Sequence, residues 1–122
     1  MEERRGNNRV PFRKAVQYFI PDKSAAGSLV QSGGCLGCNI STKGLRFYAQ
    51  DFFPPATMVH LTLPLLTEGS LTVAGYVAWV QKVPHDENYL VGVRFDDGLG
   101  NLERSRLQRY VQLHAVSNAH GL

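Results

Sequence analysis

The sequence has no apolar run long enough to cross a bilayer, and its first residues lack the apolar core of a signal peptide. We therefore expect a cytoplasmic protein without membrane insertion. Cysteine is scarce: Cys35 and Cys38 are the only two, too few for a disulfide framework. Repeats, linkers and low-complexity tracts are also missing. With 122 residues, 43% of them hydrophobic, the chain predicts a single globular domain over residues 1–122.

Patterns that support catalysis or metal binding are missing as well. Cys35 and Cys38 form C-x-x-C among glycines, whereas a redox pair favours a helix N-terminus. The four histidines stand at no zinc-ligand spacing, so we expect structural thiols and no metal. The glycine-rich stretch "GGCLGCNISTKG" (33–44) lacks the Gly-Lys-Ser/Thr ending of a phosphate-binding loop. No nucleophile stands at a recognisable spacing from a base, and we predict that the protein is not an enzyme.

What the sequence does contain is positive charge at one end. The net charge is +3, and residues 1–14 carry five basic and two acidic side chains, so the remaining residues are neutral overall. The stretch "ERRGNNRVPFR" (3–13) is broken by Gly-Asn-Asn and by Pro11, which predicts a flexible basic arm over residues 1–12. A localised excess of this kind suits a small anionic partner better than a nucleic-acid polymer.

Most of the remaining chain alternates between apolar and polar residues, which is typical of half-buried strands. A different period follows at "NLERSRLQRYVQLHA" (101–115), where Leu107, Tyr110 and Val111 fall at helical spacing and Asn101 can cap the helix. Short strands at this spacing indicate a closed barrel or a sandwich, with one C-terminal helix packed on or beside it. The predicted strands cover residues 15–20, 32–41, 45–49, 57–65, 70–83 and 89–95.

The stretch "NISTKG" (39–44) is open to two interpretations. Asn39 and Ser41 would project from the same face if the chain were extended, as binding residues could. Gly44 permits a positive φ or a close backbone approach. A β-turn that uses Asn, Ser and Gly for their turn preferences explains the same residues.

Two motifs stand in an order that resembles the PilZ family of bacterial receptors for cyclic di-GMP. The first is R-x-x-x-R at Arg5 and Arg9, preceded by Arg4, and the second is [D/N]-x-S-x-x-G at residues 39–44. The later stretches "GYVAWV" and "YLVGVRF" and the C-terminal helix are also similar to that family, so the resemblance covers residues 3–113. It implies a mainly β fold: a six- or seven-stranded antiparallel β-barrel over residues 13–97 with a C-terminal α-helix over 101–115.

The resemblance also implies where the ligand binds. Arginine donates in bidentate fashion to phosphate or guanine and stacks on bases, so the basic arm could close over a nucleotide held on the barrel. A cation at Arg4 implies two intercalated ligand molecules per chain. Trp79 lies on the strand where some relatives present an aromatic side chain to guanine, although it could face the core instead. The expected ligand-binding residues are Arg4, Arg5, Arg9, Asn39, Ser41, Gly44 and Trp79.

The leading hypothesis is a non-enzymatic, stand-alone cyclic di-GMP receptor. It would clamp the nucleotide between the arm and the barrel and signal to an unidentified protein of the flagellar, pilus or polysaccharide machinery. The main alternative is an interaction adaptor with the same fold that binds no nucleotide, and the intact arginine motif argues against it. A third hypothesis, a single-stranded nucleic-acid binder using Trp79, Tyr48 and the arm, is weakened by the neutral charge of the barrel.

Overall fold

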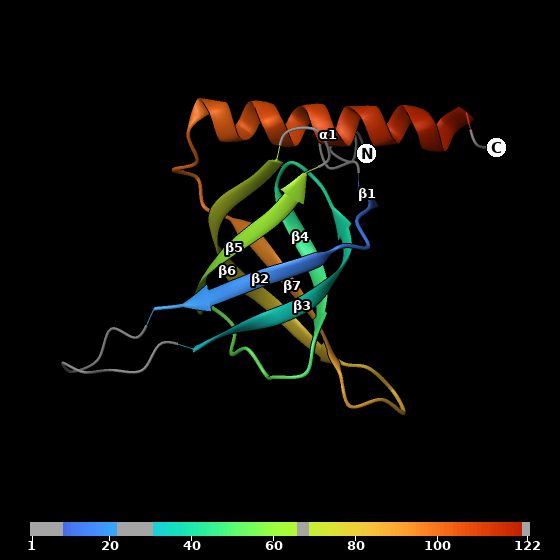
Figure 1. The fold of residues 1–122 in the computed structure, drawn as a ribbon. Coiled ribbons are helices and arrows are strands. Elements are labelled where there is room, and N and C mark those ends of the chain that lie inside the picture. Colours follow the sequence, from blue (N-terminus) through green and yellow to red (C-terminus); the bar gives the residue numbers. More distant parts are fainter. Residues whose placement is uncertain (1–8, 22–30, 66–68, 121–122) are drawn as a thin grey trace.

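A computed structural model describes residues 9–21, 31–65 and 69–120 of the protein. Antiparallel strands wrap into a barrel, and a single helix lies across one end of it (Figure 1). The elements are β1 (Val10–Pro11), β2 (Ala15–Ile20), β3 (Gln31–Ile40), β4 (Gly44–Ala49), β5 (Met58–Leu65), β6 (Gly69–Lys82), β7 (Tyr89–Phe95) and α1 (Asn101–His120).

The barrel closes because β3 pairs with two neighbours. Six strands follow the order β3-β2-β5-β6-β7-β4, and β3 returns to pair with β4. The short strand β1 lies outside this ring and pairs only with β3 among the described strands. These pairings confirm the predicted antiparallel barrel, with six strands in the ring, and its C-terminal helix.

The core follows the predicted alternation. Along β5, Val59, Leu61 and Leu63 are fully buried, as the period-two pattern required. The helix α1 starts at Asn101 as predicted and buries Leu107 against the barrel, but it runs to His120, beyond the expected end at residue 115. Within the ranges that the structure describes, no helix is long and apolar enough to span a membrane.

The last part of the predicted flexible arm is anchored instead. β1 pairs Val10 with Ile40, and the Phe12 N–H donates to the Cys38 carbonyl at 3.0 Å. Val10 and Phe12 are buried, and the Phe12 ring meets Tyr110 of α1 edge-to-face at 5.5 Å between centroids. Apolar burial at these positions outweighs the turn-forming signal of the neighbouring proline, so residues 10–12 are held against the barrel and the helix. Residues 1–8 lie outside the described part of the chain.

Two β-bulges change which face of the barrel a residue occupies. One lies on β3 between Gly37 and Asn39, and the other on β6 between Val77 and Trp79. An extra residue in one strand reverses the in-out alternation beyond it. Asn39 and Trp79, which would otherwise share the inward face of Gly37 and Val77, therefore turn to the outside of the barrel.

Candidate functional site

Four neighbouring strands place one row of residues across the outside of the barrel. Asn39 on β3 pairs with Arg46 on β4, Arg46 pairs with Gly92 on β7, and Gly92 pairs with Trp79 on β6. Directly opposite residues in antiparallel ladders have Cβ atoms about 5 Å apart. The row therefore brings an amide, a guanidinium and an indole together on one surface.

Arg9 joins this row from the edge of the barrel. It directly precedes β1, in which Pro11 pairs with Asn39. The Arg9 Nη1 donates to Asn39 Oδ1 at 2.9 Å. The structure thus brings together one residue from each of the two motifs found in the sequence, Arg9 from R-x-x-x-R and Asn39 from "NISTKG". We call Arg9, Asn39, Arg46 and Trp79 the arginine–tryptophan site.

Arg46 has the Trp79 indole as a neighbour, but one of its hydrogen-bond donors has no partner among the described residues. Its guanidinium carbon lies 5.5 Å from the centroid of the Trp79 ring, a cation–π distance. Its Nε is buried and has no hydrogen-bond partner among the described residues. A buried donor on a charged group is costly to leave unpaired. A phosphate or carbonyl oxygen bound at this position would remove that cost.

The electrostatics of the site favour an anion. Partial burial lowers the pKa of Arg9, and the positive charge of Arg46 lowers it further. Arginine stays protonated at neutral pH despite such a shift, so two cations share one partly desolvated surface. Each would be stabilised by a negative charge placed between them.

Trp79 lies flat on the barrel because the residue opposite is glycine. A Cβ at Gly92 would come within 2.3 Å of the indole Cε2 and 2.5 Å of its Nε1. The bulge at Val77–Trp79 turns the side chain outward, and the absence of a side chain at Gly92 lets the ring rest on β7. Of the two alternatives that the sequence left open, the structure places Trp79 on the outer surface rather than in the core.

Ser41 and Gly44 lie close to the site but do not face outward. Ser41 is only 1% exposed, and its Oγ accepts a hydrogen bond from the Lys43 N–H at 3.1 Å. The Ser41 N–H donates to the Gly44 carbonyl at 2.9 Å, so "NISTKG" forms the turn between β3 and β4. A Cβ at Gly44 would lie 2.3 Å from the Val93 carbonyl oxygen. The close backbone approach expected at Gly44 is therefore made to β7, and the φ of Gly44 is not positive.

Sequence reasoning missed Arg46, although a signal was present. The strand "LRFYA" alternates, so burial of Leu45 and Phe47 places Arg46 on the outside. The alternation that assigns Leu45 and Phe47 to the core thus also predicts an outward-facing Arg46. Arg4 and Arg5, the other predicted arm residues, lie outside the described part of the chain.

The two cysteines are free thiols with different surroundings. Cys35 pairs with Val16 and donates to its carbonyl at 3.6 Å, and burial raises the pKa of the Cys35 thiol to about 12. Cys38 is the bulged residue of β3, and its Sγ accepts a hydrogen bond from Asn39 Nδ2 at 3.5 Å. With Arg9 on Oδ1, both ends of the Asn39 amide are held. The described residues contain no cluster of three metal-ligating side chains.

Comparison with known proteins adds to this geometry. The PilZ domain profile matches residues 3–113. No curated protein gives a significant sequence match. Among solved structures, MrkH from K. pneumonia has a TM-score of 0.70 at 12% identity over 93% of this chain and 50% of its own. The inhibitor of motility MotI/DgrA from Bacillus subtilis has a TM-score of 0.67 at 15% identity over 89% and 51%.

A third structure is the PilZ domain of YcgR from Escherichia coli with c-di-GMP, with a TM-score of 0.65 at 10% identity over 97% of this chain and 96% of that one. The chain spans about half the length of MrkH and MotI. Identities this low show a shared fold only. The profile match covers nearly all of the sequence, and the described barrel and helix agree with it. The chain therefore belongs to the PilZ domain family of cyclic di-GMP receptors.

Proposed function

We propose that this chain is a receptor that binds cyclic di-GMP at the arginine–tryptophan site. One observation carries the proposal: the guanidinium groups of Arg9 and Arg46 interact electrostatically on a partly desolvated surface beside the half-buried indole of Trp79. The PilZ family is a non-enzymatic receptor family, which supports binding rather than catalysis. The YcgR domain, similar in fold, was determined with c-di-GMP.

The chemistry of the ligand matches the groups at the site. Cyclic di-GMP offers two phosphates and two guanines, and an arginine fork can donate to a phosphate or to guanine O6 and N7. In the proposed complex the unpaired Arg46 Nε donates to one of these oxygens. Trp79 offers its indole to a guanine face, and Asn39 offers its amide to a guanine edge.

The magnitudes are sufficient for a physiological receptor. Micromolar affinity needs about 8 kcal/mol. Charge-assisted hydrogen bonds contribute about 1.5–3 kcal/mol each, and stacking of a base on an aromatic ring contributes about 1–3 kcal/mol. Four such hydrogen bonds and one stacked base sum to about 7–15 kcal/mol, which spans that requirement before the cost of ordering the chain and ligand is subtracted.

In this proposal Ser41 and Gly44 contribute to binding indirectly, through the turn that they form between β3 and β4. The turn fixes the register in which Asn39 faces Arg46, because it closes the β3–β4 hairpin two residues beyond Asn39. Arg5 stands four residues before Arg9, and we propose that residues 1–9 close over the bound nucleotide. The liganded form then engages a downstream protein, for which flagellar, pilus and polysaccharide machineries are the candidates.

Calorimetric titration of the wild type with cyclic di-GMP, GTP and a short oligonucleotide tests the proposal. Cyclic di-GMP should bind most tightly. Arg5→Ala or Arg9→Ala should each weaken binding by about 2 kcal/mol or more, roughly 30-fold, with little change in Tm. Arg109→Ala, which removes the same charge from an exposed position on α1, serves as the control and should retain the wild-type affinity.

The titration also separates the alternatives. Wild-type affinity in the double variant Arg5→Ala, Arg9→Ala would overturn the arginine clamp. A wild type that binds none of the three probes would favour the adaptor without nucleotide, and preference for the oligonucleotide would favour the single-strand binder.

We further propose that two cyclic di-GMP molecules bind per chain as an intercalated pair, with Arg4 contacting the second. Four stacked guanines leave less base surface in water than two separate molecules do. The wild type should then saturate near two equivalents, and Arg4→Ala near one. Saturation of the wild type at one equivalent would refute the pair.

A further inference from the structure

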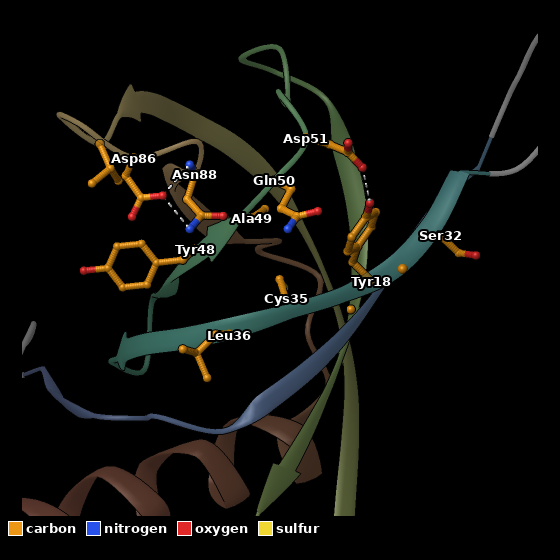
Figure 2. Close-up of a pocket in the computed structure, with 13 residues that line it drawn as sticks. Tyr18, Ser32, Cys35, Leu36, Tyr48, Ala49, Gln50, Asp51, Asp86 and Asn88 are labelled. Carbon is orange, nitrogen blue, oxygen red and sulfur yellow. Dashed lines mark hydrogen bonds between the residues drawn. The ribbon is translucent and has the colours of Figure 1, made fainter.

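A cleft of about 770 Å³ opens where β3 and β4 separate (Figure 2). Residues 32–36 of β3 form one wall, and residues 48–51 form another. Tyr18 of β2 and Val83, Asp86 and Asn88, from the connection between β6 and β7, complete the lining. None of the four residues of the arginine–tryptophan site lines this cleft, so it is a separate feature of the molecule.

The cleft exposes one edge of a strand. β2 pairs with β3 along residues 31–36, on one side of β3. On the other side β4 pairs with β3 only from Leu36 to Ile40. Toward the cleft, residues 31–35 therefore have no strand partner in the part of the chain that the structure describes.

The hydrogen-bond pattern identifies which backbone groups face the cleft. The Gly37 N–H donates to the Lys14 carbonyl at 2.9 Å, so Gly37 points toward the side of β3 that carries β1 and β2. Successive residues of a strand direct their N–H and C=O groups to opposite sides. Gly33 and Cys35 accordingly face β2, whereas Ser32 and Gly34 direct their N–H and C=O groups into the cleft.

These groups are accessible, because Ser32 and Gly34 are both exposed and both line the cleft. On the face of β3, a Cβ at Gly34 would meet nothing closer than the Gln17 Nε2 at 3.6 Å. A strand edge with unpaired N–H and C=O groups is a template for another extended chain. The cleft volume lies within the range of about 300–1,000 Å³ found for ligand sites.

The charges of the cleft indicate the kind of chain that would bind. Among the residues that the structure describes, its lining contains Asp51 and Asp86 but no lysine or arginine, in a protein whose net charge is +3. Asp51 accepts a hydrogen bond from the Tyr18 hydroxyl at 3.0 Å, and Asp86 accepts two from Asn88, so both carboxylates are held in place. Lys82 donates to the backbone carbonyl of Asp86 rather than to its carboxylate.

We propose that this cleft binds an extended, basic segment of a partner protein. The segment pairs with β3 through Ser32 and Gly34, and its lysine or arginine side chains lie near Asp51 and Asp86. The proposal does not depend on nucleotide binding. It gives β3 two surfaces, the partner edge at residues 31–35 and, beyond the bulge, Asn39 of the arginine–tryptophan site.

The probe for this proposal is an acetylated, amidated heptapeptide, Lys-Thr-Val-Lys-Val-Thr-Lys. Titrated into isotope-labelled protein, it should shift the amide resonances of residues 32–36 and 49–51 and slow hydrogen exchange at Ser32 and Gly34. A version N-methylated at alternate residues cannot form the strand pairing, and a version with glutamate in place of lysine loses the charge match. Both should bind at least tenfold more weakly.

A pair of variants at one position tests the edge itself. Gly34→Pro removes the N–H that faces the cleft without removing a bond to β2, and Gly34→Ala keeps it. The proline variant should lose at least tenfold in peptide affinity, and the alanine variant should match the wild type. Both should keep the wild-type amide resonances of residues away from the cleft, which shows that they are folded.

Several results would overturn the proposal. These are the absence of peptide binding at millimolar concentration, equal binding of the N-methylated or glutamate peptide, resonance shifts confined to another surface, and unchanged peptide affinity in Gly34→Pro. Peptide binding at residues 31–35 in a protein that does not bind cyclic di-GMP would support this proposal and overturn the nucleotide proposal alone.

Discussion

Replacing Gly92 with alanine tests whether the flat position of Trp79 matters for ligand binding. The added Cβ would lie 2.3–2.6 Å from three indole atoms, closer than Cβ contacts in real proteins come. The backbone of β7 is held by pairing with both β4 and β6, whereas the indole is only half-buried. We therefore expect the ring, rather than the strand, to move. Arg46 then loses its stacking partner.

The expected effect follows from what the displaced ring contributes. Stacking of one base on an aromatic ring is worth about 1–3 kcal/mol, and an exposed cation–π contact about 0.5–1 kcal/mol. If Trp79 stacks on a guanine, Gly92→Ala should weaken cyclic di-GMP binding by about 1–3 kcal/mol, or roughly 5- to 150-fold. Because the ring leaves a surface position, the free energy of unfolding should fall by no more than about 1 kcal/mol.

Two measurements on the same samples distinguish the displacement of the Trp79 ring from the change in ligand affinity. Trp79 is the single tryptophan of the chain, so its fluorescence reports directly on the displacement of the ring. Calorimetric titration then gives the affinity. Gly34→Ala is the matched control, because a Cβ there makes only ordinary van der Waals contacts, none closer than 3.6 Å, and it should change neither quantity. A shifted fluorescence spectrum with unchanged affinity in Gly92→Ala would show that Trp79 does not contact the ligand.

Three other predictions follow from the arm and the thiols. Cyclic di-GMP should slow amide exchange in residues 1–9 if the arm closes over it, and unchanged exchange in the saturated complex would exclude closure. The variant Cys35→Ser, Cys38→Ala should keep ligand binding, and the native protein should contain no stoichiometric zinc by metal analysis; bound zinc would refute the structural role. Because burial raises the pKa of Cys35 from 9.0 to about 12, the folded state holds this proton more tightly than the unfolded state does. The stabilisation is present below pH 9 and is lost as the pH rises toward 12, so urea unfolding should show a shallower alkaline decline in Cys35→Ala than in the wild type.

The parts of the fold that sequence predicted well are those that depend on burial alone. Two patterns mark a face that is buried away from water: the alternation in "TMVHLTLPL" and the helical spacing of Leu107, Tyr110 and Val111. Such patterns tolerate variation in loops and hold over a whole element. The expected end of α1 at residue 115 was too early because the apolar spacing stops near there, although no glycine or proline stands before Gly121 to end the helix.

The candidate site was less accessible to sequence reasoning because its faces are set by bulges. A period-two pattern assigns Asn39 to the side of Gly37 and Trp79 to the side of Val77, and the structure reverses both. A bulge inserts one residue into a strand without changing the kinds of residue that form the strand. No local sequence pattern therefore indicates where a bulge lies. Only the pairing with Arg46 and with Gly92 shows that the two side chains share an outer surface.

We expect the two arginines of the R-x-x-x-R motif to contribute to binding in different ways. Arg9 precedes Val10, which is 2% exposed and paired with Ile40, so its backbone is held by the core, and its side chain already bonds Asn39 at 2.9 Å. Binding through Arg9 thus begins from an ordered group and loses little entropy. Arg5 lies four residues before Arg9. The sequence between them, Gly-Asn-Asn, contains no apolar side chain that could order this segment. We therefore expect the free energy gained by Arg5 to be reduced by the ordering of that segment, which gives the motif one preorganised contact on the barrel and one that forms with the ligand.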